Sequence, residues 1–259
     1  MSDSGGLSSV RNAARVLKAF TSKHRVFGVT ELAHHLGLST SSVHRLLTTL
    51  ESEHLIERDP HTGKYQLGLA VYDLAAAMSA GYDLSEALLP PMTVLRNRTG
   101  ETVQVAVLDG RQVVYVERLD SPHTLRLFLE VGRRNWAHCS STGKVLLAFL
   151  PKEKLDRVLA GWDMPAITPY TIVDPELLRK ELAEVRDLGY AANLSESEVG
   201  VTSVAAPIRD GTGHVIAAMS VAGPATRMDP ELNLLRYAVM EAAAVASRRL
   251  GHHHGRPAP

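Results

Sequence analysis

The chain has 259 residues, of which 45% are hydrophobic and 22% charged, and its formal net charge at pH 7 is +0. This composition indicates a globular protein with one large or two smaller domains. The zero net charge excludes a global basic field, so any contact with nucleic acid must come from a local patch. A single cysteine, Cys139, excludes an internal disulfide. Because there is no signal-peptide pattern and no apolar run near the ~18 residues of a membrane span, we expect a cytoplasmic protein with no membrane partner.

The first 37 residues predict a disordered N-terminal segment at residues 1–7 and then two helices. Ser8 or Ser9 can cap the first helix. Its apolar positions are Val10, Ala13, Ala14, Leu17 and Phe20. Thr30 can cap the second helix, and Gly37 suits the left-handed position that ends one.

Residues 38–51 predict a third helix with an unusual polar face. Its apolar residues recur at i, i+3, i+4 and i+7, namely Val43, Leu46, Leu47 and Leu50. The opposite side carries hydroxyl, imidazole and guanidinium groups, which donate to phosphates and base edges. A helix, a tight glycine turn and a second helix form a helix-turn-helix. The candidate DNA contacts of this segment are Ser39, Thr40, Ser41, Ser42, His44, Arg45 and Thr48.

Residues 55–68 predict a β-hairpin directly after that helix. Leu55 and Ile56 precede a cluster of turn residues at 59–63, after which apolar and polar residues alternate. A hairpin in this position is a wing, and Arg58 and Lys64 would then lie beside the phosphate backbone. The alternative is that the two charges belong to a solvated hairpin edge.

The rest of the chain alternates between helical and strand patterns. Residues 69–80 predict a connecting helix, and Pro90 and Pro91 mark a kink in the next helix or its start. Two helices have clear end signals: Asp174 with Pro175 and Gly189, then Asp229 with Pro230 and Gly251. Strands are expected at residues 102–109, 112–118, 125–130, 201–208 and 214–223, and a further helix at 143–150. This order indicates an α+β domain with a largely antiparallel sheet flanked by helices.

The segment around residues 138–144 is the best small-molecule candidate. The first turn of a helix leaves N–H groups that favour anions, and Ser140, Ser141 and Thr142 add hydroxyl donors. Gly143 would let a ligand approach the backbone. The alternative is simple capping of a buried helix by a serine.

Several blocks resemble, in order, the IclR family of transcriptional regulators. They are ELAHHLGL, STSSVHRLLTTLE and HLIERDPHTGKYQLG, followed by residues 99–121, 138–151 and 199–227. The resemblance implies a winged helix-turn-helix at 1–68, a linker helix at 69–83 and a GAF-like effector-binding domain at 84–251. The tail at 252–259, HHHGRPAP, lies outside the resemblance and is expected to be disordered. The resemblance also implies a homodimer or a dimer of dimers. Family members often carry Lys where this chain has Thr40, which removes one phosphate contact.

The resemblance also implies an effector pocket in the second domain. Asn193 stands where some members have an acidic residue, and Ala222 where a hydroxyl is common, so a larger or more apolar ligand is expected than pyruvate or glyoxylate. The matching positions are Ser141, Thr142, Asn193, Val201, Ser203, Ser220 and Ala222.

The main alternative from a different functional class is a small-molecule sensor or a metabolic enzyme with a vestigial N-terminal domain. Cys139 lies beside His138, but neighbours on a strand point to opposite faces and cannot pair as nucleophile and base. His34 and His35 diverge on a helix and are poor metal ligands. We therefore expect no catalytic residue, cofactor or metal.

The sequence thus predicts a ligand-responsive regulator that binds a palindromic double-stranded DNA operator. A small organic acid or aromatic metabolite would alter its DNA affinity. A repressor is the interpretation that we favour, and an activator is the alternative.

Overall fold

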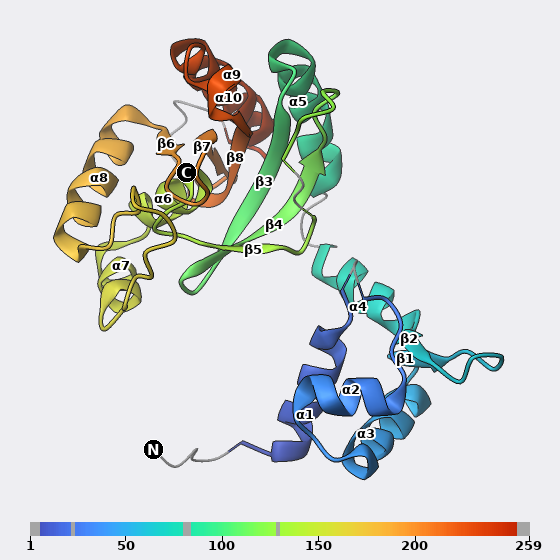
Figure 1. Ribbon diagram of the computed structural model, residues 1–259. Coiled ribbons are helices and arrows are strands. Elements are labelled where there is room, and N and C mark those ends of the chain that lie inside the picture. The colour runs from blue at the N-terminus through green and yellow to red at the C-terminus, as the bar shows by residue number, and fades with distance from the viewer. Residues whose placement is uncertain (1–5, 22–23, 80–83, 128–129, 253–259) are drawn as a thin grey trace. The chain divides into compact units, whose positions relative to one another are not determined.

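The computed structural model describes residues 6–21, 24–79, 84–127 and 130–252 (Figure 1). The chain divides into two compact units, residues 1–82 and 83–259, which are described separately below. The predicted disorder of residues 1–5 and 253–259, and the end of the predicted linker at 80–83, lie outside the described residues. Within the described ranges, no helix is long and apolar enough to cross a membrane.

The first unit is a bundle of short helices closed by a hairpin. Its core is formed by buried side chains of all three leading helices and the hairpin, including Val16, Leu32, Leu47 and Tyr65. The elements are α1 (Ser8–Ala19), α2 (Val29–Leu36), α3 (Thr40–Ser52), β1 (Ile56–Arg58), β2 (Tyr65–Leu67) and α4 (Ala70–Ser79).

The predicted caps of the first two helices are wrong. Leu7 is the N-cap of α1 and Gly28 that of α2, and neither cap uses a side-chain hydrogen bond. Instead, the Glu31 carboxylate accepts from the Gly28 N–H at 3.3 Å, which satisfies one donor of the helix start. In α1, Val10 is exposed, and Val16 takes the central core position.

The turn between α2 and α3 is as predicted. Gly37 adopts a left-handed conformation with φ of 66°, and the Leu38 N–H donates to the Ala33 carbonyl at 3.0 Å. This bond satisfies a carbonyl at the end of α2. The turn allows α3 to pack across α2 with Val43, Leu47 and the rest of its apolar stripe inside.

The hairpin is also confirmed. β1 and β2 pair antiparallel with Arg58 opposite Tyr65, and Phe27 adds a bridge to Tyr65. The chain then passes through Gly68 into α4. A Cβ at Gly68 would lie 2.3 Å from the His54 carbonyl oxygen, so only glycine fits at this crossing.

The second unit has three layers. A six-stranded sheet, ordered β5-β4-β3-β8-β7-β6 with antiparallel neighbours, lies between two groups of helices (Figure 1). The strands are β3 (Thr102–Asp109), β4 (Gln112–Leu119), β5 (Arg134–Trp136), β6 (Ala191–Leu194), β7 (Val201–Arg209) and β8 (Val215–Pro224). The helices are α5 (Leu84–Thr99), α6 (Ser141–Ala148), α7 (Lys152–Leu159), α8 (Pro175–Leu188), α9 (Ala225–Met228) and α10 (Leu232–Arg249). The predicted α+β class with an antiparallel sheet is confirmed.

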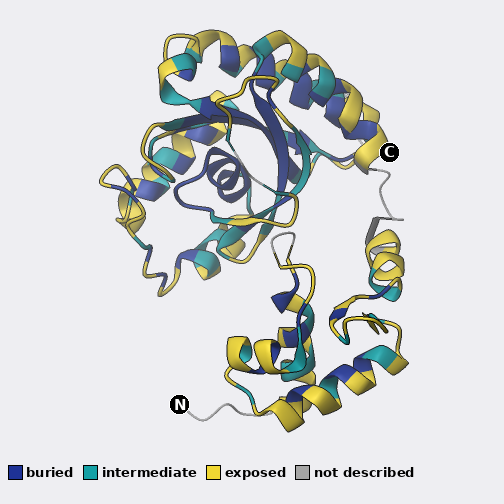
Figure 2. Ribbon diagram, turned by 45° about the vertical axis from the view of Figure 1, so that its right-hand side comes forward, coloured by how far each residue is buried: buried dark blue, intermediate teal, exposed yellow. Residues whose placement is uncertain are grey.

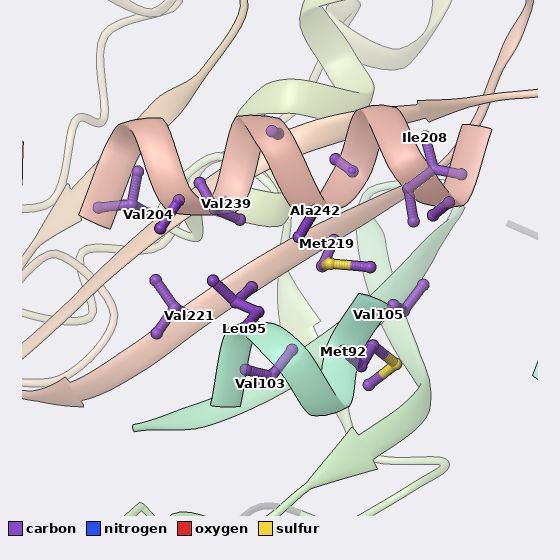
Figure 3. Packing of buried hydrophobic residues seen from close by; sticks show 14 of the residues in the cluster. Met92, Leu95, Val103, Val105, Val204, Ile208, Met219, Val221, Val239 and Ala242 are labelled. Atoms are coloured by element: carbon purple, nitrogen blue, oxygen red, sulfur yellow. The ribbon is translucent and has the colours of Figure 1, made fainter. Parts of the chain in front are cut away.

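The two faces of the sheet have separate cores. On one face, α5 and α10 cover alternate strand residues such as Val105, Val204 and Met219 (Figure 3). On the other face, α6, α7 and α8 contribute Leu147, Leu178 and their neighbours. Figure 2 shows the strands as a dark blue, buried layer and the outer sides of the flanking helices in yellow. Because α6 is buried along its whole length, both ends of this helix lie inside the protein.

Several predicted details of this unit are wrong. Residues 125–127 and 130 are not in a strand, and β5 instead begins at Arg134. Of the two alternatives for Pro90 and Pro91, a helix start is wrong, because α5 begins before Pro90 and runs through both prolines. Glu231 precedes α10, whereas the Asp229 carboxylate accepts from the Thr202 hydroxyl at 2.6 Å. Asp174 and Gly189 do cap α8 as predicted.

Candidate nucleic-acid interface and ligand cavity

The start of α3 carries a network of hydroxyl groups. Ser39 is the N-cap, and its Oγ accepts from the Ser42 N–H at 3.2 Å and donates to the Ser42 Oγ at 2.8 Å. The Ser41 Oγ lies 3.1 Å from the Ser39 Oγ. These residues and Thr40 are exposed at the positive end of the helix dipole. The arrangement suits a phosphate group.

The outward face of α3 presents His44, Arg45 and Thr48, all exposed. The Thr48 hydroxyl donates to the His44 carbonyl at 3.0 Å, so it faces an external partner as an acceptor. Among the described residues, no side-chain hydrogen bond or ion pair holds His44 or Arg45. An exposed guanidinium without an internal partner is available to bind a guanine edge or a phosphate.

The two wing residues differ in their contacts. The Arg58 Nε donates to the Gly63 carbonyl at 3.2 Å, and its guanidinium lies 5.7 Å from the Tyr65 ring centroid. Arg58 therefore stabilises the hairpin turn through contacts within the protein. Lys64 is exposed on the second strand's side of the turn and fits a phosphate contact better. The Asp59 carboxylate accepts from two turn N–H groups, which lowers its pKa and fixes the turn.

In the second unit, the start of α6 is a buried capped junction. The Ser140 Oγ accepts from the Gly143 N–H at 3.2 Å, so the capping alternative is correct for this serine. The Ser141 Oγ lies 2.7 Å from the Ser203 Oγ. Gly143 does not face a ligand: a Cβ there would lie 2.3 Å from the Ala137 main chain. The glycine is needed for this close packing.

A cavity of about 330 Å³ lies beside this junction, on the α6 side of the sheet. Five of the seven expected effector residues line it: Asn193, Val201, Ser203, Ser220 and Ala222. Ser141 and Thr142 lie outside its lining, although Ser141 contacts the lining residue Ser203. Ser140, expected as a hydroxyl donor at the start of this helix, does line the cavity. The lining residues that sequence reasoning missed are Gln104, Tyr115, Arg126, Leu127, Arg133, Asn135, Ser197 and Glu198.

These residues make the cavity more polar than the sequence suggested. On β3 and β8 the polar side chains alternate with core residues, as in Val103-Gln104-Val105 and Ser220-Val221. Since alternate residues of a strand face opposite sides of the sheet, Gln104 and Ser220 face the cavity while the valines fill the core. Polar residues at every second position of an otherwise buried strand were the signal that could have revealed them.

Asn193 is fixed by three hydrogen bonds at the cavity wall. Its Oδ1 accepts from the Glu196 N–H at 2.7 Å, and its Nδ2 donates to the Ser197 and Ser203 hydroxyls at 2.9 and 3.4 Å. The amide therefore ties β6 to both β7 and the loop that follows β6. This loop contributes Ser197 and Glu198 to the lining.

The same loop contributes Glu196 to a buried ion-pair cluster. The Lys144 Nζ, from α6, donates to the Glu196 and Glu181 carboxylates at 2.6 and 2.9 Å. Lys144 is fully buried. Burial raises the pKa of Glu196, and the Lys144 charge opposes that shift. The cluster joins α6, α8 and the loop after β6 into one unit.

His138 and Cys139 do not form a catalytic pair. β5 ends at Trp136, so both lie in a turn rather than on the strand assumed from the sequence. The His138 Nε2 donates to the Pro165 carbonyl at 3.0 Å, and the Cys139 Sγ lies 3.7 Å from the Trp136 carbonyl. Burial raises the pKa of Cys139 to about 12, so the thiol stays protonated. In the ranges that the structure describes, no group of three potential ligands could hold a metal ion.

Comparison with known proteins identifies the family. Residues 76–248 match the family described as bacterial transcriptional regulator IclR C-terminal, and residues 9–60 match the IclR helix-turn-helix domain. The chain belongs to the IclR family of transcriptional regulators. It is thus related to DNA-binding regulators of transcription with an effector-binding domain, as the sequence blocks suggested.

Individual IclR relatives are similar over nearly their whole length. The HTH-type transcriptional regulators XynR and KdgR of Escherichia coli K12 are 33% and 32% identical, over 95% of this chain and 98% and 94% of theirs. An IclR homologue from Microbacterium hydrocarbonoxydans, solved in complex with 4-hydroxybenzoate, is 30% identical with a TM-score of 0.83. That match covers 94% of this chain and 99% of the homologue.

Proposed function

We propose that this IclR-family protein is a cytoplasmic, ligand-responsive repressor that binds a palindromic operator as a homodimer or a dimer of dimers. The observation that carries the proposal is the exposed polar face of α3, where the Arg45 and His44 side chains make no hydrogen bond or ion pair with the described residues. Two such helices would read half-sites about 34 Å apart or a multiple of this distance.

The DNA contacts divide into two kinds. Ser39, Thr40, Ser41 and Ser42 would bind phosphates at the start of α3, together with Lys64 and Arg58 in the wing. His44, Arg45 and Thr48 would reach base edges in the major groove. Phosphate contacts set register, whereas base contacts give specificity.

The cavity beside α6 is the proposed effector site. Asn193, Val201, Ser203, Ser220 and Ala222 would contact the effector directly, and Ser141 and Thr142 would support that wall. An effector can change DNA affinity only if it binds the DNA-competent and DNA-incompetent arrangements unequally. We assign no catalytic residue, because the protonated thiol of Cys139 lacks a base.

Fluorescence anisotropy with DNA from upstream of the protein's own gene tests this function. We expect binding at nanomolar concentrations, with affinity that falls steeply as salt rises and at least a thousandfold preference over random DNA. Equal affinity for upstream and random DNA would contradict the proposal. An increase in transcription from that promoter on adding the protein would identify an activator instead.

A further inference from the structure

The walls of the effector cavity are almost entirely polar. Of its fourteen lining residues among those described, only Leu127, Val201 and Ala222 have aliphatic side chains. An aromatic acid needs apolar walls against both faces of its ring. Tyr115 adds one aromatic ring, but the other ten lining residues are polar or charged, and seven of them carry amide or hydroxyl groups.

The inner wall offers an acceptor that is not satisfied within the protein. Gln104 is almost fully buried, and its Oε1 has no hydrogen-bond partner. On the adjacent strand, Ser220 pairs directly with Gln104. A buried acceptor without a donor costs about 1–3 kcal/mol, which a hydroxyl of a ligand would relieve. A carboxylate has no proton to donate, so it cannot satisfy this atom.

The rim of the cavity carries the charges. Arg126 and Arg133 lie there, both exposed, with Glu198 as the opposing carboxylate. The Arg126 Nη1 makes one long hydrogen bond, at 3.4 Å, to the His123 carbonyl. The two guanidinium groups outnumber the single carboxylate of the lining, which favours an acidic ligand. Arginine binds a carboxylate well through paired N–H groups.

We propose that the effector is a polyhydroxylated monocarboxylic acid, such as an aldonate. Its carboxylate binds Arg126 and Arg133 at the rim, and its hydroxyls bind Gln104, Ser220 and the other amide and hydroxyl groups of the inner wall. This inference rests on the proposed role of the cavity as the effector site. It differs from the larger or more apolar ligand expected from Asn193 and Ala222 alone.

Isothermal titration calorimetry on the full-length protein tests the ligand class with matched probes. Four- to six-carbon aldonates, including D-gluconate, supply both the carboxylate and the hydroxyls. Sorbitol lacks the carboxylate, hexanoate lacks the hydroxyls, and 4-hydroxybenzoate supplies an aromatic ring. We expect at least one aldonate to bind at least tenfold more tightly than the other three probes. Failure of every aldonate to bind, or tighter binding of hexanoate or 4-hydroxybenzoate, overturns the proposal.

Two variants locate the bound acid. Arg133→Gln should weaken aldonate binding at least tenfold by removing the charge, and Gln104→Met should weaken it by removing the amide at nearly constant volume. Arg157→Gln, which removes an exposed charge on α7 outside the cavity lining, is the matched control and should leave the affinity unchanged. Thermal unfolding of each variant separates lost binding from lost folding. An Arg133→Gln or Gln104→Met protein that folds and binds the aldonate as before would refute the assignment.

Operator binding without any ligand separates this inference from the proposed function. A protein that binds its operator but responds only to aromatic acids disproves the ligand class alone. A protein that binds no operator disproves the proposed function, whatever the calorimetry shows.

Discussion

At the scale of single residues, the neutral amide of Asn193 keeps a negative charge out of this part of the cavity wall. Asp at this position can still accept from the Glu196 N–H, and the Ser197 and Ser203 hydroxyls can rotate to donate to it. Asn193→Asp should therefore fold but place a negative charge against an acidic effector. We expect effector affinity to fall at least tenfold by calorimetry. Ala222→Ser, which adds a hydroxyl and no charge, is the control and should retain binding; equal losses in both variants would contradict this role for charge.

His138 makes stability depend on pH. Burial lowers its pKa below the ordinary value of 6.5, and its Nε2 donates to Pro165 as a neutral ring. As the pH falls below 6.5, His138 is therefore protonated more readily in the unfolded chain than in the folded chain, which favours unfolding. Stability from this residue is complete above pH 6.5 and is lost below it. The melting temperature should fall between pH 7.5 and 5.5, and His138→Gln should show a smaller fall; an equal fall in both proteins would exclude His138 as the cause.

The effector site shows what single residues reveal from sequence. Ser203 and Ser220 could be found through the family resemblance, because they belong to recognisable blocks. The alternation along β3 indicates which face of the sheet Gln104 takes, but it does not bring Gln104 and Asn135 to one cavity. That depends on β3 and β5 belonging to the same sheet, and strand pairing between distant segments is not encoded in any local pattern. Arg126 and Arg133 lie in a segment that the sequence wrongly assigned partly to a strand.

At the scale of elements, the passage from the hairpin into α4 depends on Gly68. Gly68→Ala places a methyl group against the His54 main chain, which cannot move without displacing the hairpin. We expect the free energy of unfolding of the first unit to fall by about 1–3 kcal/mol, measured by urea denaturation. Gly28→Ser, at a helix N-cap with open space around its Cβ position, should be neutral or stabilising. Equal stability of Gly68→Ala and the parent protein would contradict the close packing of Gly68 against the His54 main chain.

Elements with strong local signals could be predicted from sequence, including the short hairpin strands β1 and β2, whereas β5 and β6 could not. α3 has a clear apolar stripe, and α8 has an Asp N-cap and a Gly at its end. The start of α2 lacked such a signal, because its N-cap Gly28 has no side chain and Glu31 accepts from the Gly28 N–H instead. β5 and β6 have three and four residues, and their stability comes from neighbouring strands rather than local propensity.

At the scale of the whole molecule, the apolar surface of α4 predicts self-association. Leu69 and Tyr72 are 82% and 76% exposed, and Leu74 is 63% exposed. Exposed apolar groups in this number on one short segment mark an interaction surface. Tyr72→Glu should raise the dimer dissociation constant at least tenfold in sedimentation velocity, whereas Glu153→Gln on α7 should not. A Tyr72→Glu protein that sediments as the parent does would remove α4 from the interface.

The central claim is that α3 reads DNA sequence through Arg45. Replacing Arg45 by alanine and comparing upstream with random DNA by anisotropy tests it most directly, with Arg157→Ala as the control for loss of one positive charge. We predict that Arg45→Ala loses about 1–3 kcal/mol of binding to upstream DNA and much less to random DNA, while Arg157→Ala changes neither. An Arg45→Ala protein that retains the parent's preference for upstream DNA would contradict the account.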